Sequence, residues 1–238
     1  MAELPGRELR YLADQAWAPY GERSLAQVRE RSEAVAGYLI SDGASAVVVA
    51  CNSASAAALH DLRARFPETP FIGMEPAVKP AASTSQRRVI GVLATEATFQ
   101  GELFASVVDR HARDVGVIAR ACPGLAAAIE DRPLDDPFVV ELVHRYTEPM
   151  AARGADVIVL GCTHYAFVAG AVAVAAGPGV RVIDPAPAVA RRVSEVVGET
   201  DPSEPGPVTF TTTGEARRFA TQVERLLGIR THVTALSL

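Results

Sequence analysis

Two segments of the chain repeat one pattern, a short run of β-branched apolar residues that ends in a cysteine. The first reads VVVACNSAS around Cys51, and the second reads VIVLGCTHY around Cys162. Such a run is typical of a buried parallel strand, and α/β sheets bind ligands at the carboxyl ends of their strands. A helix that begins at the cysteine favours the thiolate. The repeat therefore predicts two strand–helix units whose thiols act as a pair of bases facing one substrate.

A single free cysteine at the end of a core strand is more often a small buried apolar residue than a catalytic group. The repetition of the same setting favours catalysis for Cys51 and Cys162. Cys122, in RACPGL, lacks this setting and is expected to be structural. Three cysteines without a CxxC pair indicate a reducing compartment rather than a disulfide framework or a zinc site.

Short Val/Ile/Ala runs alternate with longer segments of helical period, which is the pattern of parallel βαβ units. Helices are expected after Ser24, whose pairing with Gln27 reads as a capping box, after Cys51, and over residues 136–152. The expected strands are residues 9–12, 46–50, 71–74, 89–94, 115–119, 157–160, 180–183, 208–212 and 232–235.

Two segments are expected to connect domains: the Pro-rich residues 75–88, and IDPAPAV at residues 183–189. The predicted fold is α/β, with two similar domains that have largely parallel sheets and are related by a pseudo-twofold axis. Residues 1–75 and 185–238 form the first domain, which carries Cys51, and residues 76–184 form the second, which carries Cys162. The active site is expected in the interdomain cleft. Residues 199–207, ETDPSEPGP, are expected to form a surface loop.

The charge of the chain limits its partners. With 238 residues, 49% of them hydrophobic, the chain can bury a large core, and its net charge of −5 offers no basic stripe for nucleic acid. No apolar run reaches membrane-spanning length, and the N-terminus lacks the apolar core of a signal peptide. The expectation is a cytoplasmic protein that binds a small molecule, without nucleic-acid or membrane partners.

Several segments, in order along nearly the whole chain, carry a resemblance to a known family. They are ADQAWAPYGERS at 13–24, VVVACNSASA at 47–56, IGVLATEATFQ at 90–100, ACPGLAAAIE at 121–130, DVIVLGCTHY at 156–165, IDPAPAVA at 183–190 and FTTTGEARRF at 210–219. Together they resemble the cofactor-independent glutamate racemases of the aspartate/glutamate racemase superfamily. The resemblance implies inversion at Cα of glutamate by two bases, without pyridoxal phosphate or metal, and supply of D-glutamate for peptidoglycan. Lys79, the only lysine, has no pyridoxal-binding context.

The resemblance also implies roles for single residues. Cys51 and Cys162 would act on opposite faces of the substrate, with Glu130 and His164 assisting proton transfer at Cys162. The substrate-binding residues would be Pro19, Tyr20, Gly21, Asn52, Ser53, Thr95, Thr98 and Thr163. Two structural alternatives stay open: Thr95 and Thr98 could cap a helix, and His164 could be a satisfied histidine at a strand end.

The chain departs from the family at its start. MAELPGRE contains neither the N-terminal strand nor the Asp-Ser-Gly-x-Gly-Gly loop that family members carry. A truncated start is the favoured explanation, and a shortened paralogue is the other. The alternative functions are therefore another isomerase activity of the superfamily, on aspartate, hydantoin or maleate, and a non-catalytic binding role. A homodimer is a further expectation.

Overall fold

The computed structural model describes residues 6–198 and 206–238. Its strands are β1 (Leu9–Ala13), β2 (Val47–Val49), β3 (Phe71–Gly73), β4 (Val89–Ala94), β5 (Gly116–Ala121), β6 (Val157–Gly161), β7 (Arg181–Ile183), β8 (Val208–Thr212) and β9 (Val233–Ala235). Its α-helices are α1 (Leu25–Ser41), α2 (Asn52–Arg65), α3 (Val78–Thr84), α4 (Glu96–Gln100), α5 (Glu102–His111), α6 (Leu125–Asp131), α7 (Pro137–Ala152), α8 (Ala169–Ala176), α9 (Ala186–Val197) and α10 (Ala216–Leu227). The described residues also form two 3-10 turns, η1 (Tyr20–Glu22) and η2 (Thr163–Val168).

All strand pairs within the described ranges are parallel, which confirms the predicted α/β class. The strands form three sheets, with the orders β5-β4-β6-β7, β1-β8-β9 and β2-β3. Every expected strand overlaps an observed one. The reason is that buried parallel strands are short apolar runs bounded by turns, which is a local signal.

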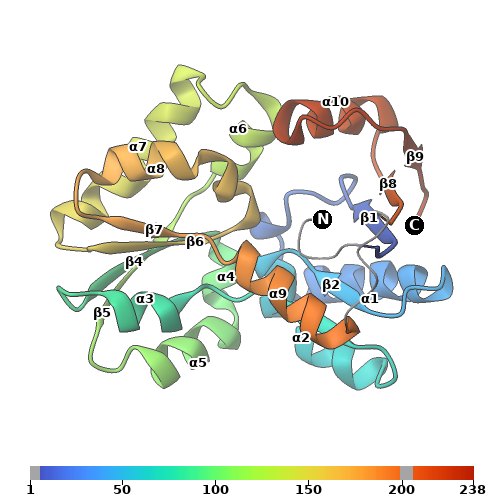
Figure 1. Cartoon of the computed structure of the whole chain (residues 1–238), viewed down its shortest axis with the longest axis horizontal. Coiled ribbons are helices and arrows are strands. Elements are labelled where there is room, and N and C mark those ends of the chain that lie inside the picture. The colour runs from blue at the N-terminus through green and yellow to red at the C-terminus, as the bar shows by residue number, and fades with distance from the viewer. Residues whose placement is uncertain (1–5, 199–205) are drawn as a thin grey trace.

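The four-stranded sheet has helices on both faces, with α7 and α8 on one side and α3 and α5 on the other (Figure 1). Successive residues of β6 point to opposite faces, as strand geometry requires. Ile158 and Leu160 pack in the core beneath α7 and α8, whereas Val157 and Val159 pack in the core towards α3 and α5. All four are at most 1% exposed, so β6 is a central, fully buried strand that ends directly before Cys162.

The other two sheets have their own small cores. Phe210 and Phe219 join β8 to α10, while Val47 of β2 packs with residues of α1 and α2. No strand pair links β1 to β2 within the described residues, and Tyr11 and Val48 on these strands are 49% and 38% exposed.

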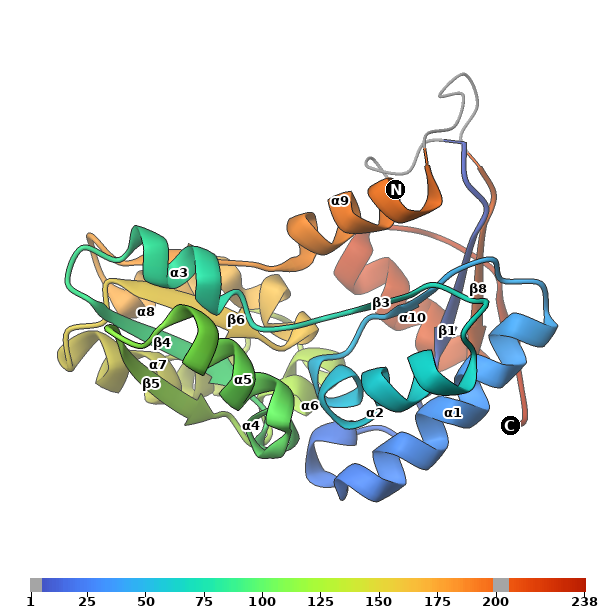
Figure 2. The same cartoon turned by 90° about the horizontal axis from the view of Figure 1, so that it is seen from below.

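The chain passes between the four-stranded sheet and the remaining elements where β3 leads to α3 and where β7 leads to α9 (Figure 2). These passages agree with a division near residues 75 and 185, which stays a prediction.

The segment 75–88, which is expected to connect domains, also contains the helix α3. Val78, Ala81 and Ala82 are buried on one helical face against the four-stranded sheet. Pro80 stands in the first turn of α3, where a missing backbone N–H costs nothing. Residues 199–205 of the expected surface loop, and residues 1–5, lie outside the described residues.

The predicted helix starts were right. Ser24 and Gln27 form a capping box at α1, and Asp136 caps α7. Cys51 is the N-cap of α2. Cys162 opens the 3-10 turn η2, which continues into α8.

Candidate active site

Cys51 lies between the end of β2 and the first turn of α2. Its Sγ accepts a hydrogen bond from the backbone N–H of Ala54, at 3.5 Å. Burial raises the pKa of the Cys51 thiol, the N–H of Ala54 acts in the opposite direction, and the charge of Cys162 raises it further. Cys51 therefore favours the neutral thiol in the absence of a ligand.

Asn52 follows Cys51 and is only 3% exposed. Neither its side-chain oxygen nor its side-chain nitrogen has a hydrogen-bond partner in the described part of the protein. A buried amide without partners costs about 1–3 kcal/mol for each unsatisfied group, so native proteins rarely keep one. The unpaired amide beside Cys51 is thus the kind of group that a polar ligand satisfies.

Cys162 is the first member of a chain of three side chains. Its Sγ lies 3.7 Å from Nδ1 of His164, and Nε2 of His164 lies 2.6 Å from Oε1 of Glu130. Burial alone would lower the pKa of His164, but the hydrogen bonds to Cys162 and Glu130 outweigh it and raise this pKa to about 10. An imidazolium therefore stands between the sulfur and the carboxylate at neutral pH. The environments of the two cysteines differ, because no comparable cation contacts Cys51 among the described residues.

One hydrogen bond joins the two cysteine turns. Oγ1 of Thr163, the residue after Cys162, donates to the carbonyl oxygen of Ala50, the residue before Cys51, at 3.3 Å. The two thiols are also close enough for the charge of Cys162 to act on Cys51. The structure thus brings together the two units that the sequence repeats.

A second bridge involves hydroxyl groups. Oγ of Ser53 lies 2.8 Å from Oγ1 of Thr95, which lies 3.0 Å from Oγ1 of the buried Thr98. Thr95 also accepts from the backbone N–H of Thr98 and caps α4, so the structural alternative holds for Thr95 while its hydroxyl still contacts Ser53.

The turn that carries Pro19, Tyr20 and Gly21 rests on Thr95. A Cβ placed on Gly21 would lie 2.7 Å from Cβ of Thr95, which is closer than real contacts allow. Tyr20 packs in one apolar cluster with Cys51. The residues implied as substrate-binding therefore surround the cysteine turns.

Sequence reasoning missed the group that holds Tyr20. The hydroxyl of Tyr20 donates to Asp14, at 2.5 Å, and Arg31 donates to both carboxylate oxygens of Asp14, at 2.8 and 2.6 Å. Thr213 donates to the same carboxylate, at 2.7 Å. Burial opposes ionisation of Asp14, but these hydrogen bonds keep its pKa below the usual value. The available signal was Arg31 itself, a charged residue three positions after the buried Val28 on the apolar side of α1.

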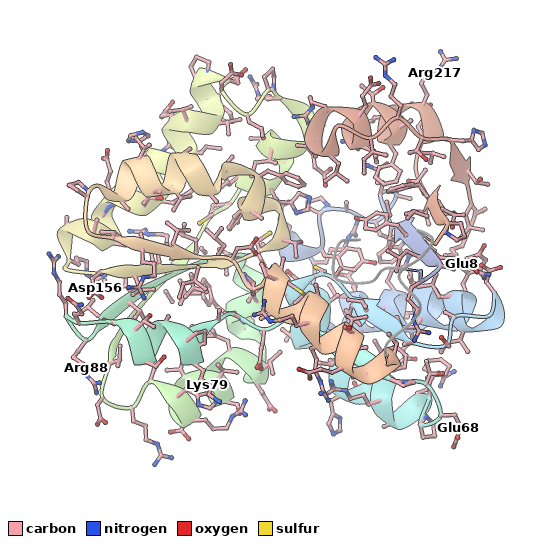
Figure 3. The ribbon with its side chains drawn as sticks, viewed as in Figure 1. Glu8, Glu68, Lys79, Arg88, Asp156 and Arg217 are labelled. Carbon is pink, nitrogen blue, oxygen red and sulfur yellow. The ribbon has the colours of Figure 1, made fainter. Side chains whose placement is uncertain are left out.

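Other residues lie outside this group. Cys122 is buried, burial raises its pKa to about 12, and its Sγ donates to the carbonyl of Arg120, which agrees with a structural role. Lys79 is exposed on α3 (Figure 3). Within the described ranges, no three His, Cys, Asp or Glu side chains are grouped as a metal site would require. Among the described helices, none combines the length and apolar character that a bilayer-spanning segment requires.

Comparisons with known proteins show which proteins this chain resembles. Residues 2–193 match the model of the Asp/Glu/Hydantoin racemase family. The chain is 50% identical over 228 residues to a glutamate racemase of a Roseiflexus species, covering 94% of this chain and 84% of that protein.

Solved structures of glutamate racemases have a similar fold. The glutamate racemase isoform RacE1 of Bacillus anthracis superposes with a TM-score of 0.89 at 29% identity, covering 100% of this chain and 90% of that one. The Escherichia coli glutamate racemase, solved in complex with L-glutamate and an activator, gives 0.82 at 25% identity, covering 96% and 88%.

Proposed function

The chain belongs to the Asp/Glu/Hydantoin racemase family and is an isomerase, and on that premise we propose that it interconverts L- and D-glutamate with Cys51 and Cys162 as its two bases. The observation that carries the proposal is the hydrogen bond from Thr163 to Ala50, since it joins the turns of both cysteines. The relatives are named glutamate racemases, so another isomerase activity or a non-catalytic role is not favoured.

Inversion at Cα needs one group that removes a proton from one face and another that returns a proton to the opposite face. The two cysteines suit this division, because Cys51 favours the thiol and His164 places a cation 3.7 Å from Cys162 that pairs with a thiolate. In one direction Cys162 takes the Cα proton and Cys51 donates its own. After turnover the protonation states are exchanged, and the reverse reaction restores them.

Substrate binding follows from the unpaired polar groups. The side-chain amide of Asn52 has no hydrogen-bond partner within the described ranges, and the hydroxyls of Ser53, Thr95 and Thr98 form one connected row next to it. Amide and hydroxyl donors stabilise the negative charge that develops on the substrate as the proton leaves. We place the α-amino and carboxylate groups at Asn52, Ser53 and Thr163. The side-chain carboxylate would lie towards the turn of Tyr20 and Gly21.

We further propose that the reaction takes place between domains formed by residues 1–75 with 185–238 and by residues 76–184. The contacts Thr163–Ala50 and Ser53–Thr95 each cross that division, which supports this placement. The product D-glutamate would serve peptidoglycan synthesis in the cytoplasm. Self-association stays a prediction that sedimentation can test.

The test is direct. The purified chain, dialysed against a chelator and free of pyridoxal phosphate, is incubated with L-glutamate or D-glutamate, and optical rotation is followed. We expect both solutions to converge on the racemate, and L-aspartate to react far more slowly. Stable rotation of both glutamate enantiomers would contradict the proposal, and faster reaction of aspartate would reassign the substrate. Rescue of a D-glutamate auxotroph tests the biosynthetic role.

A further inference from the structure

Helix α10 holds the end of α6, the short helix that carries Glu130. The motif FTTTGEARRF leads into α10, and the site described above leaves the helix itself unused. In Figure 1, α10 lies beside α6 although the two helices are far apart in the sequence. Arg218, Gln222 and Arg225 follow one another at spacings of four and three residues, so they share one face of α10.

Arg225 makes the largest number of hydrogen bonds from α10 to the end of α6. Its guanidinium donates to the carbonyl oxygens of Ile129, Glu130 and Arg132, at 2.9, 2.6 and 2.6 Å. The last carbonyls of a helix have no partner within the helix, and a cation there also complements the negative end of the helix dipole. Arg225 therefore fixes the backbone on both sides of Glu130.

Gln222 makes the buried contact, since it is 7% exposed. Its Nε2 donates to the carbonyl oxygen of Glu130, at 3.2 Å, and its Oε1 accepts from the side chain of Gln15. Gln15 in turn accepts from Thr212 at the end of β8, at 3.1 Å. The backbone of Glu130 is thus tied to a sheet in the other half of the protein. The ion pair of Arg218 with Asp131 is exposed on both sides and adds little.

We propose that Gln222 and Arg225 are positioning residues for proton transfer at Cys162. They hold the backbone of Glu130, whose carboxylate accepts from His164 at 2.6 Å, and His164 lies beside Cys162. The inference rests on the proposed function. A displacement of about 1 Å in such a relay costs on the order of a hundredfold in rate. Because no hydrogen bond links Cys51 to His164 or Glu130 among the described residues, the effect should fall on the proton transfers at Cys162, on one face of the substrate.

Kinetic isotope effects test whether the loss is confined to the proton transfers at Cys162. In Arg225→Met and in Gln222→Met, we expect kcat to fall about tenfold or more, with KM changed by less than about twofold. The primary isotope effect on kcat/KM with glutamate deuterated at Cα should rise for the enantiomer that Cys162 deprotonates. It should fall for the other enantiomer, because reprotonation by Cys162 then limits the rate. Arg225→Lys, which keeps a cationic donor, should restore part of the rate.

Arg217→Met is the matched control, since Arg217 lies on the outer, exposed side of α10 (Figure 3). It should leave the rate and both isotope effects unchanged. Isotope effects that stay equal for the two enantiomers in the Arg225 and Gln222 variants would overturn the proposal. An equal loss of kcat in Arg217→Met would also overturn the proposal.

A second measurement does not depend on turnover. Iodoacetamide alkylation of each cysteine is followed by mass spectrometry at fixed pH. In Arg225→Met, the rate at Cys162 should fall about threefold or more relative to Cys51, because the imidazolium that activates the sulfur is less well held. An unchanged ratio would overturn the proposal. If the parent chain does not racemise glutamate, the proposed function fails, and this ratio still decides whether α10 positions the relay.

Discussion

Thr163 donates a hydrogen bond to the carbonyl oxygen of Ala50, and through this contact the turn after β6 meets the turn after β2. The two residues are 113 positions apart in the sequence. Each is the immediate neighbour of a cysteine, so the bond brings the turns that carry Cys51 and Cys162 together. The two thiols are close enough that charge on Cys162 raises the pKa of Cys51.

Replacement of either cysteine should abolish racemisation. Cys51→Ser and Cys162→Ser should each lower the rate by orders of magnitude, because a hydroxyl near its usual pKa is a much poorer base than a thiol. The measurement is deuterium entry at Cα from each enantiomer in deuterated water. Cys122→Ser is the control, and it should retain the parent rate because the buried Cys122 donates to the carbonyl of Arg120 and makes no hydrogen bond with His164 or Glu130 in the described part of the protein. Near-parent racemisation by either single variant would rule out the two-base mechanism.

The activity should decline at alkaline pH as His164 loses its proton. The pKa of His164 is raised to about 10, so the imidazolium is present at neutral pH and is lost as pH rises through that value. Glu130→Gln removes the carboxylate that supports the cation, and the alkaline limb of kcat/KM should then move to lower pH. His144→Gln, which changes a histidine on α7 paired with Glu148, should leave the limb in place. A limb that is unaffected by Glu130→Gln would show that His164 does not set it.

The same raised pKa predicts how His164 contributes to stability. A group whose pKa is higher in the folded than in the unfolded state stabilises the fold fully below its unfolded pKa, about 6.5 for histidine. That contribution is lost as pH rises through about 10. The difference in urea midpoint between the parent and His164→Asn should therefore be largest below neutral pH and shrink towards pH 10. A difference that grows over this range would contradict the assignment.

Breaking the buried ion pair under Tyr20 should destabilise the fold. Asp14 and Arg31 have side chains that are only 9% and 7% exposed, so Asp14→Asn leaves a buried guanidinium without its counter-charge. The expected loss in the free energy of unfolding is about 3–5 kcal/mol. Asp109→Asn breaks a pair with Arg113 that is 70% and 73% exposed, and should cost less than about 1 kcal/mol. Urea unfolding measures the loss in both variants. Equal losses would show that the buried pair stabilises the fold no more than the exposed pair does.

Gly21→Ala should impair substrate binding without unfolding the protein. The new methyl group would lie 2.7 Å from Cβ of Thr95, so the turn with Tyr20 must shift away from the hydroxyl row. We expect KM for glutamate to rise about tenfold, which corresponds to roughly 1.4 kcal/mol. Gly170→Ala is the control, since its added Cβ meets nothing within 4 Å inside α8. Unchanged KM in Gly21→Ala would place the substrate away from this turn.

Much of the site was accessible from local patterns. The strand ends at Cys51 and Cys162, the capping box at Ser24 and the helix over residues 136–152 depend on neighbouring residues, and each was predicted correctly. The pairing of His164 with Glu130 was expected only from a family resemblance, because the two residues lie 34 positions apart. The helix α3 was missed, because the prolines of residues 75–88 favoured a connecting segment. The apolar residues of α3 nevertheless form a buried face.

The sequence by itself determined the parallel α/β class, the places of the strands and the two cysteine turns, because hydrophobic period and caps act over a few residues. Only the tertiary structure decided the contacts through which the two cysteine turns meet. The Thr163–Ala50 bond, the Asp14 group under Tyr20 and the hold of α10 on α6 join distant residues. Such contacts form when elements pack against each other, and no local pattern encodes their partners. The charge that distinguishes the surroundings of Cys162 from those of Cys51 arises in the same way, from a helix that packing brings to His164.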